Sequence, residues 1–402
     1  MEKFSAFRDP GTGIQPFLRP IPPTGSEALL IATSPLRYAI GLVRTLLVLI
    51  LGILHALIVE VVCQVLRSVP PLYRVVSHVS TALFARLALL FIGLPWIPVH
   101  VVSRKRGYAY HPRASECLIL TSPRRRNSKT NETWSPGAGD LIVSNWVSTI
   151  EILWLAFRFN PIFVLPVSAA GEQAQQAATP SSPITRTPGR RTGTGSAAIS
   201  SPAARAPTPR VPILGFRQTS LFGMLRATGH VPSAVQAHTT SSDVKSLEEI
   251  RGGADRPVVQ RSRTAQCPLD KVQGVHHVCP VGAPLSAFRF ILTPLPCSYD
   301  PPTTFCPTLA HPIPYSALNP LPHIFSLTTS LAPYTLSIRL LSLADAPSSG
   351  AFVTSEFTAG QNSDILTEAC ASLIAQIGKV KRVGFGWEDK AAFLEFYRSK
   401  RR

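Results

Sequence analysis

The first hundred residues carry two apolar runs that stand apart from the rest of the chain. From Ile40 to Leu66 nearly every residue is apolar, and the charged residues Arg44 and Glu60 lie near the two ends of the run. A second run extends from Thr81 to Val102 and contains several interruptions. Because roughly 20 apolar residues are needed to cross a bilayer, the first run predicts a membrane helix and the second a poorer one.

Polar and helix-breaking residues set the limits of these runs. Pro70 and Pro71 predict a break between two helices, and the basic cluster from Ser103 to Arg106 closes the second run. Basic residues beside a membrane helix favour the cytosolic face. We therefore expect a polar segment over residues 1–37, followed by a membrane hairpin over residues 38–106 that enters and leaves by one face. The alternative is a buried helical pair in a soluble protein.

Beyond the hairpin, short runs rich in Leu, Ile, Val and Phe alternate with stretches of helical periodicity. Such an alternation is typical of an α/β fold, with a sheet flanked by helices. We expect the sheet domain in two parts, residues 107–170 and residues 210–402, the second ending in helices and a basic tail. The predicted strands are 117–120, 141–144, 162–167, 257–259, 288–292 and 336–341, and the predicted helices are 148–159 and 363–379.

The two parts are separated by residues 171–209, which contain Ala, Ser, Pro, Thr, Gly and Arg but almost no large apolar side chain. Such a composition cannot bury enough apolar surface to offset the entropy of ordering. We therefore predict a disordered insert. The absence of acidic residues from Gln173 to Ser242 leaves two interpretations open, a segment that lies on an anionic membrane and a solvated basic linker.

Charge and cysteine content narrow the possible partners. The chain has a formal net charge of +18, yet only 15% of its residues are charged and 45% are hydrophobic. This mixture favours a membrane surface over nucleic acid, for which we find no recognition motif and predict no binding. The seven cysteines form no CxxC pair, so we expect reduced thiols and no metal site.

Several common catalytic motifs are absent, among them GxSxG, GxxxxGK[ST], GxGxxG and HExxH. What remains is the strand-to-helix unit from Asp140 to Val167. This unit resembles the His-x4-Asp block of the glycerolipid acyltransferases. On that resemblance Trp146 occupies the position of the histidine base, Glu151 that of the orienting aspartate, and Asn145 precedes them. Because an indole cannot take up a proton, the block is degenerate and predicts weak catalysis.

Both ends of the chain carry a more specific resemblance. The opening Met1–Leu18 and the stretch Asp389–Tyr397 before the basic tail are similar to a fungal branch of lysophosphatidic acid acyltransferase-like proteins, some of which carry a vacuolar-sorting name. The resemblance runs from end to end apart from the inserts.

A second family block resembles residues 221–232, and it implies substrate binding by Gly223, Arg226, Gly229 and His230. Arg226 would meet phosphate groups. The third block requires a glutamate shortly after Val259, which this chain lacks. We therefore hypothesise that residues 260–296 come from a wrong reading frame or an unspliced intron.

The resemblance implies a membrane-bound enzyme that transfers a fatty acyl chain from acyl-CoA, as co-substrate, to lysophosphatidic acid or a related lysophospholipid. It implies no bound cofactor, membrane lipids as partners, and the endoplasmic reticulum membrane or lipid droplets as location, with the main domain cytosolic. The alternative is a non-catalytic member that acts in lipid binding, tethering or vacuolar protein sorting. From its position alone, Glu151 is as well suited to capping a helix as to catalysis. Nothing in the sequence predicts an oligomeric state.

Overall fold

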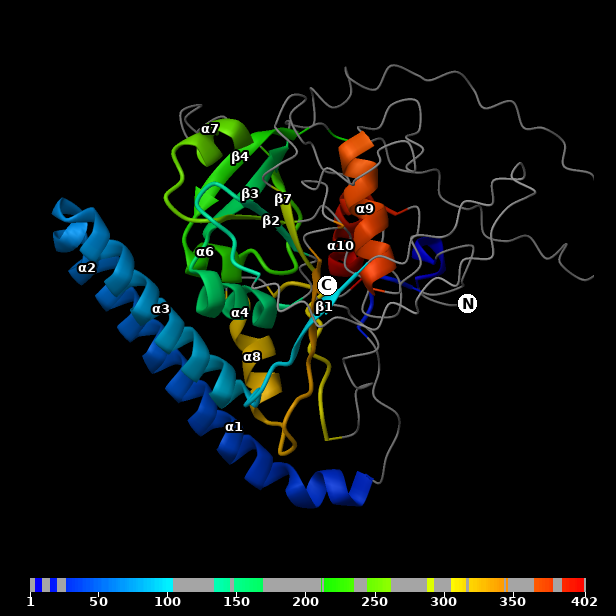
Figure 1. Ribbon diagram of the computed structural model, residues 1–402. Coiled ribbons are helices and arrows are strands. Elements are labelled where there is room, and N and C mark those ends of the chain that lie inside the picture. The colour runs from blue at the N-terminus through cyan, green and yellow to red at the C-terminus, as the bar shows by residue number, and fades with distance from the viewer. Residues whose placement is uncertain are drawn as a thin grey trace, which may run out of the picture.

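The computed structural model describes residues 4–8, 15–19, 27–103, 134–144, 148–168, 211, 213–234, 244–261, 288–292, 305–315, 318–342, 345, 365–378 and 385–400. These residues form an α/β domain with an apolar helical hairpin along one side (Figure 1). The predicted strand at 117–120 and the predicted disordered insert lie outside the described residues.

The domain is built on one mixed sheet in the order β1-β8-β7-β2-β6-β3-β4, with β5 beside β3. Most neighbours run parallel, whereas the pairs β3/β4 and β7/β8 are antiparallel. The strands are β1 (Val99–Val102), β2 (Leu141–Ser144), β3 (Ile162–Ser168), β4 (Ile213–Thr219), β5 (Ser233–Ala234), β6 (Val258–Arg261), β7 (Phe288–Leu292) and β8 (Ile338–Leu341).

Helices cover both faces of this sheet. The remaining elements are η1 (Ser5–Phe7), α1 (Glu27–His55), η2 (Ala56–Val62), α2 (Cys63–Val65), η3 (Leu66–Ser68), α3 (Pro70–Ile92), α4 (Thr149–Phe159), α6 (Leu221–Arg226), α7 (Leu247–Gly252), α8 (Leu321–Thr328), α9 (Ile365–Gly378) and α10 (Trp387–Ser399). Ile142 and Val259 point into a core shared with α3, α4 and α8. Their neighbours Leu141 and Val258 point into a second core, shared with α7 and α9. This alternation is the two-residue period of a strand, so each face of the sheet has its own core.

The hairpin differs in its bounds from the prediction. Helix α1 begins at Glu27, inside the segment predicted to be polar, and α3 begins at Pro70, eleven residues before the second apolar run. At the other end the prediction was wrong, because α3 ends at Ile92 and Val99–Val102, assigned to the hairpin, forms strand β1 of the sheet. Proline is compatible with the first turn of a helix, where its missing N–H has no partner to lose. The stretches Ile31–Val59 and Pro70–Ile92 are each long and apolar enough to cross a membrane, but their most apolar windows are only 11% and 33% buried. The described hairpin is therefore compatible with membrane association and is not a buried core pair.

One side of the hairpin is docked on the domain through small and hydroxylated residues. Thr45 Oγ1 lies 2.7 Å from Thr328 Oγ1 at the end of α8, and Thr328 also contacts the carbonyl oxygen of Gly41. A Cβ atom at Gly41 would come within 2.6 Å of the side chain of Thr329, so the close approach of α1 to α8 requires glycine there. On α3, the residues buried against the domain include Ser77 and Ala85. The hairpin therefore runs along the domain and does not project from it as an isolated span (Figure 1).

The two ends of the chain pack together. Phe7 and Phe17 are buried against Phe393 of α10, with the ring centroids of each pair 5.3 Å apart. Arg19 extends this contact by donating to the hydroxyl of Tyr315 at 2.8 Å. The two segments that carry the most specific family resemblance thus form one aromatic cluster.

The sheet confirms most of the predicted strands. The predicted strands at 141–144, 162–167 and 288–292 and the helix at 148–159 match β2, β3, β7 and α4 closely. Strand β7 pairs in parallel with β2 although it lies inside the stretch hypothesised to be misread. That pairing argues against the hypothesis for residues 288–292.

Candidate functional site

Helix α4 places Glu151 at the position that the family resemblance assigns to a carboxylate. Ser148 caps the helix, and Oε2 of Glu151 accepts a hydrogen bond from the backbone N–H of Ser148 at 2.7 Å, which completes a capping box. Glu151 is 2% exposed. Its carboxylate therefore has a structural role at this helix terminus, whatever further role it has.

Two residues of the predicted catalytic block lie outside the described part of the chain. Asn145 and Trp146 fall in the gap between β2 and Ser148, so their predicted roles stay predictions. The flanking hydroxyl groups of Ser144 and Thr149 are buried, and neither has a hydrogen-bond partner among the described residues.

The second predicted block forms helix α6 and the turn that follows it. A Cβ atom at Gly223 would collide with the side chain of Thr219, so the start of this helix requires glycine. Arg226 ends the helix with an exposed side chain. Gly229 has a φ of 80°, and a Cβ atom there would come within 2.9 Å of the carbonyl oxygen of His311. Both glycines that the resemblance singled out thus have a steric reason to be glycine.

Asn319 holds this turn in place, although no motif in the sequence singles it out. Its amide nitrogen donates to the carbonyl oxygens of Arg226 at 2.7 Å and Thr228 at 2.8 Å. Its amide oxygen therefore faces Nε2 of His311, 2.6 Å away, and also accepts from the backbone of Tyr315. Because the amide oxygen can only accept, Nε2 carries the proton of the His311 ring.

His311 is held neutral at physiological pH. Burial lowers its pKa to about 4, and the positive charges of Arg19 and Lys390 act in the same direction, while the bond to Asn319 opposes them. The ring stacks on His323, whose pKa burial also lowers well below its usual value. Both rings are almost completely buried. We therefore assign them to positioning the loop and not to proton transfer with a substrate.

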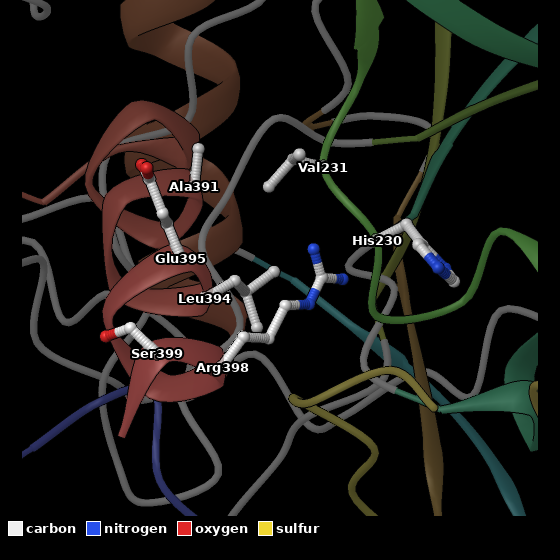
Figure 2. A pocket seen from close by; sticks show the side chains of 7 residues that line it. All are labelled: His230, Val231, Ala391, Leu394, Glu395, Arg398 and Ser399. Atoms are coloured by element: carbon white, nitrogen blue, oxygen red, sulfur yellow. The ribbon is translucent and has the colours of Figure 1, made fainter. Parts of the chain in front are cut away.

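His230 lies at the edge of a separate pocket between the turn and α10. This pocket of about 420 Å³ includes Val231 and Leu394 as apolar walls, with Arg398 and Glu395 as its charged groups. Arg398 extends from α10 toward the loop that carries His230, whereas the His230 ring is directed away from α10 (Figure 2). The pocket therefore does not aim the imidazole at the guanidinium.

An apolar cavity of about 430 Å³ separates the hairpin from the domain. Its walls come from α1, α3, α4, α6 and α8. Gly52 and Phe222 line it side by side, since a Cβ atom at Gly52 would lie 3.6 Å from the ring of Phe222, and Arg226 and Asn319 also line it. This cavity joins the apolar hairpin to the second predicted block, which makes it the candidate site for a lipid chain.

The predicted site residues are only partly brought together. Gly223 and Arg226 share α6, which packs against α4 and so lies beside the helix of Glu151. Neither Glu151 nor His230 lines the apolar cavity, and His230 belongs to the pocket beside α10.

Comparison of the chain with protein-family models, with curated proteins and with solved structures finds no match in any of the three. Within the described ranges, no group of three or more His, Cys, Asp or Glu side chains is arranged to hold a metal ion. Among the described residues, Cys63, Cys306 and Cys370 are free thiols.

Proposed function

We propose that this chain is a membrane-associated acyltransferase of the glycerolipid type that transfers acyl chains slowly from acyl-CoA to a lysophospholipid. The observation that carries the proposal is the apolar cavity between the hairpin and the domain. A lipid chain that leaves the membrane beside α1 enters an apolar space without crossing water, so it avoids the cost of about 0.8 kcal/mol per CH₂ that exposure to water would carry.

The polar groups at the borders of this cavity support a substrate that carries phosphate. Arg226 lines the cavity with an exposed side chain that has no hydrogen-bond partner among the described residues. An arginine binds phosphate in a bidentate manner, as coenzyme A and lysophosphatidic acid both require. Leu153 lines the same cavity and lies two residues after Glu151 on α4. The carboxylate of Glu151 is therefore on the same helix as a residue of the cavity wall, two positions away in sequence.

A second candidate function is lipid binding without catalysis, and the state of Glu151 favours it. One oxygen of its carboxylate is occupied by the backbone N–H of Ser148, and Trp146 at the base position has no proton-accepting group. A general base typically contributes about 10²–10⁴-fold to a rate, so a chain without one would retain lipid binding but transfer acyl groups slowly.

The test is transfer of labelled oleate from oleoyl-CoA to lysophosphatidic acid by membranes that contain the full chain. The informative variant is Glu151→Gln, because glutamine also completes a capping box and so preserves the helix while removing the charge. Loss of transfer with an unchanged unfolding temperature supports the acyltransferase. Equal transfer by Glu151→Gln and wild type excludes Glu151 as a catalytic residue.

The cavity is tested separately. Gly52→Leu places a side chain in the cavity beside Phe222, whereas Leu54→Phe adds bulk to the exposed side of the same helix. We expect Gly52→Leu to lower oleate binding about tenfold, equivalent to roughly 1.4 kcal/mol, and Leu54→Phe to leave it unchanged. Equal binding by both variants contradicts the assignment of the cavity.

A further inference from the structure

A second cavity, about 710 Å³ in volume, lies between the hairpin and the sheet and is unlike the first. It is bounded by the residues that precede β3 and β6 and by the end of β4, so it opens at the amino edge of two parallel strands. Many of its walls are polar. The polar residues that line it are His55, Tyr73, Ser77, Thr81, Asn160, Gln218, Thr219, Ser220, Asp255 and Arg256.

Helix α3 contributes a polar stripe to this cavity. Tyr73, Ser77 and Thr81 follow one another at intervals of four residues, so they lie on one side of the helix. Ser77 and Thr81 are 1% and 3% exposed. Ser77 accepts from the side-chain amide of Asn160 at 3.3 Å, at the end of α4. Three polar side chains of α3 thus face this cavity.

Asp255 and Arg256 line the cavity, and Arg74 of α3 lies beside them without lining it. Asp255 binds Nε of Arg74 at 3.1 Å and Nε of Arg256 at 3.4 Å, so two guanidinium groups share one carboxylate. Among the described residues, neither guanidinium group has another hydrogen-bond partner, so the terminal nitrogens of both can donate to a ligand. Guanidinium groups in this state are suited to a phosphate group, which accepts several hydrogen bonds at once.

His55 lies where the two cavities adjoin, because it lines both. Its Nε2 atom is 3.2 Å from Thr81 Oγ1, and its ring packs on Phe84 and Phe222. The residue is 5% exposed, and its Nδ1 atom is buried without a hydrogen-bond partner among the described residues. The chain changes from α-helix to the π-helix η2 directly after His55. Segments of π-helix are rare in proteins, and those that occur often lie at functional sites.

We propose that the polar cavity binds the phosphate-bearing headgroup of a membrane phospholipid whose chain occupies the apolar cavity on the other side of His55. This inference rests on the proposed function only in assigning a lipid chain to the apolar cavity. The headgroup site is separate from the catalytic block. Asn160 and Glu151 lie at opposite ends of α4, and a helix of 11 residues is roughly 16 Å long. The bound lipid therefore fastens the hairpin to the domain at a distance from Glu151.

The experiment measures ligand binding to the purified full-length chain in detergent micelles. Three probes separate the parts of the ligand: oleoyl lysophosphatidic acid, monooleoylglycerol without phosphate, and glycerol 3-phosphate without a chain. Arg256→Gln removes the cation that lines the cavity, and Gln218→Glu adds a negative charge from the opposite wall. Arg217→Gln is the matched control, because Arg217 is an exposed cation on β4 that does not line the cavity.

We expect Arg256→Gln and Gln218→Glu to weaken the binding of lysophosphatidic acid at least about tenfold and to leave the binding of monooleoylglycerol unchanged. The binding of glycerol 3-phosphate should be too weak to measure. Arg217→Gln should leave all three as in wild type. The inference is overturned if Arg256→Gln binds the three probes as Arg217→Gln does, or if Arg256→Gln weakens the binding of monooleoylglycerol as much as that of lysophosphatidic acid. If the binding of lysophosphatidic acid depends on Arg256 while Gly52→Leu changes the binding of neither lipid, the headgroup site holds. The assignment of a lipid chain to the apolar cavity, on which the proposed function rests, then fails.

Discussion

The amide oxygen of Asn319 lies 2.6 Å from Nε2 of His311, and this pair fixes the turn after α6. Through its amide nitrogen, Asn319 also binds the carbonyl oxygens of Arg226 and Thr228. A buried amide that meets four partners has a single orientation, so it orders every segment that it touches. The segment carrying His311 is thereby held against the turn carrying Arg226 and Gly229, although more than 80 residues separate the two segments in sequence.

The pKa of His311 makes the stability of this region depend on pH. The folded-state pKa is about 4, against an ordinary value of 6.5, so between these values the unfolded chain binds more protons. The free energy of unfolding contributed by His311 is therefore complete above about pH 6.5 and falls as the pH is lowered toward 4. At about 1.4 kcal/mol per pH unit, the loss between pH 7 and pH 5 is about 2 kcal/mol.

His311→Gln tests this assignment, because a glutamine nitrogen can still donate to Asn319 but does not titrate. Urea unfolding of the detergent-solubilised chain at pH 7 and pH 5 gives the free energies. The difference between wild type and variant should change by about 2 kcal/mol over that interval, with wild type losing more. Equal pH dependence of the two proteins contradicts the assignment.

Gly229 should be intolerant of substitution for a reason that the structure specifies. Its φ of 80° is unfavourable for other residues, and a Cβ atom would approach the carbonyl oxygen of His311 to 2.9 Å. We expect Gly229→Ala to lower the free energy of unfolding by about 1–3 kcal/mol. The matched control is Gly252→Ala at the end of α7, where no atom lies within 4 Å of the added Cβ. Thermal unfolding should rank the two variants in that order, and equal losses would refute the steric argument.

The sequence predicted the buried strands because their signal is local. Residues 141–143 are wholly apolar, and the structure buries every residue of β2, including Ser144. The helix at 149–159 was also predictable, since Ser148 and Glu151 form a capping box in sequence as well as in space. The exposed apolar hairpin was predictable from its length and composition.

The rest of the site depends on contacts between distant segments, which periodicity does not reveal. Asn319 and His311 lie in a proline-rich stretch without a recognisable motif, and their partners are about 80 to 90 residues away. The start of α3 was misplaced for a related reason. Tyr73 and Ser77 reduce the apolar character of its first half, yet they face a polar cavity of the domain and not the lipid. Only the tertiary structure explains polar residues on that side.

The docking of α1 on α8 predicts a cross-link inside native membranes. Because Thr45 Oγ1 and Thr328 Oγ1 are 2.7 Å apart, cysteines at both positions should form a disulfide on mild oxidation. The bond is identified by peptide mass spectrometry, which separates it from bonds of the native cysteines. Val43 is exposed on the same helix, so Val43→Cys with Thr328→Cys should give no such peptide. Equal yields from the two pairs would mean that α1 does not lie along the domain in the membrane.

The undocked side of the hairpin should bind the membrane, because all but six of the exposed large apolar side chains in the described part of the chain lie between Leu29 and Leu90. Leu46 and Ile50 are 55% and 44% exposed and lie one helical turn apart on α1. Replacing both by glutamate puts two charges into the hydrocarbon region, at a cost of several kcal/mol. We expect this double variant to be released from membranes by alkaline carbonate while wild type remains bound.

Leu214→Glu is the control for that experiment, because Leu214 is 54% exposed but lies on β4, away from the hairpin. It should remain in the membrane pellet like wild type. If the released double variant is soluble and still unfolds cooperatively, the two charges act on membrane contact and not on folding. This is the expected result because both replaced side chains are exposed on the hairpin. Release of the wild-type protein by salt alone would contradict membrane binding through the apolar hairpin. A protein held by apolar burial stays in the membrane when salt screens its charges.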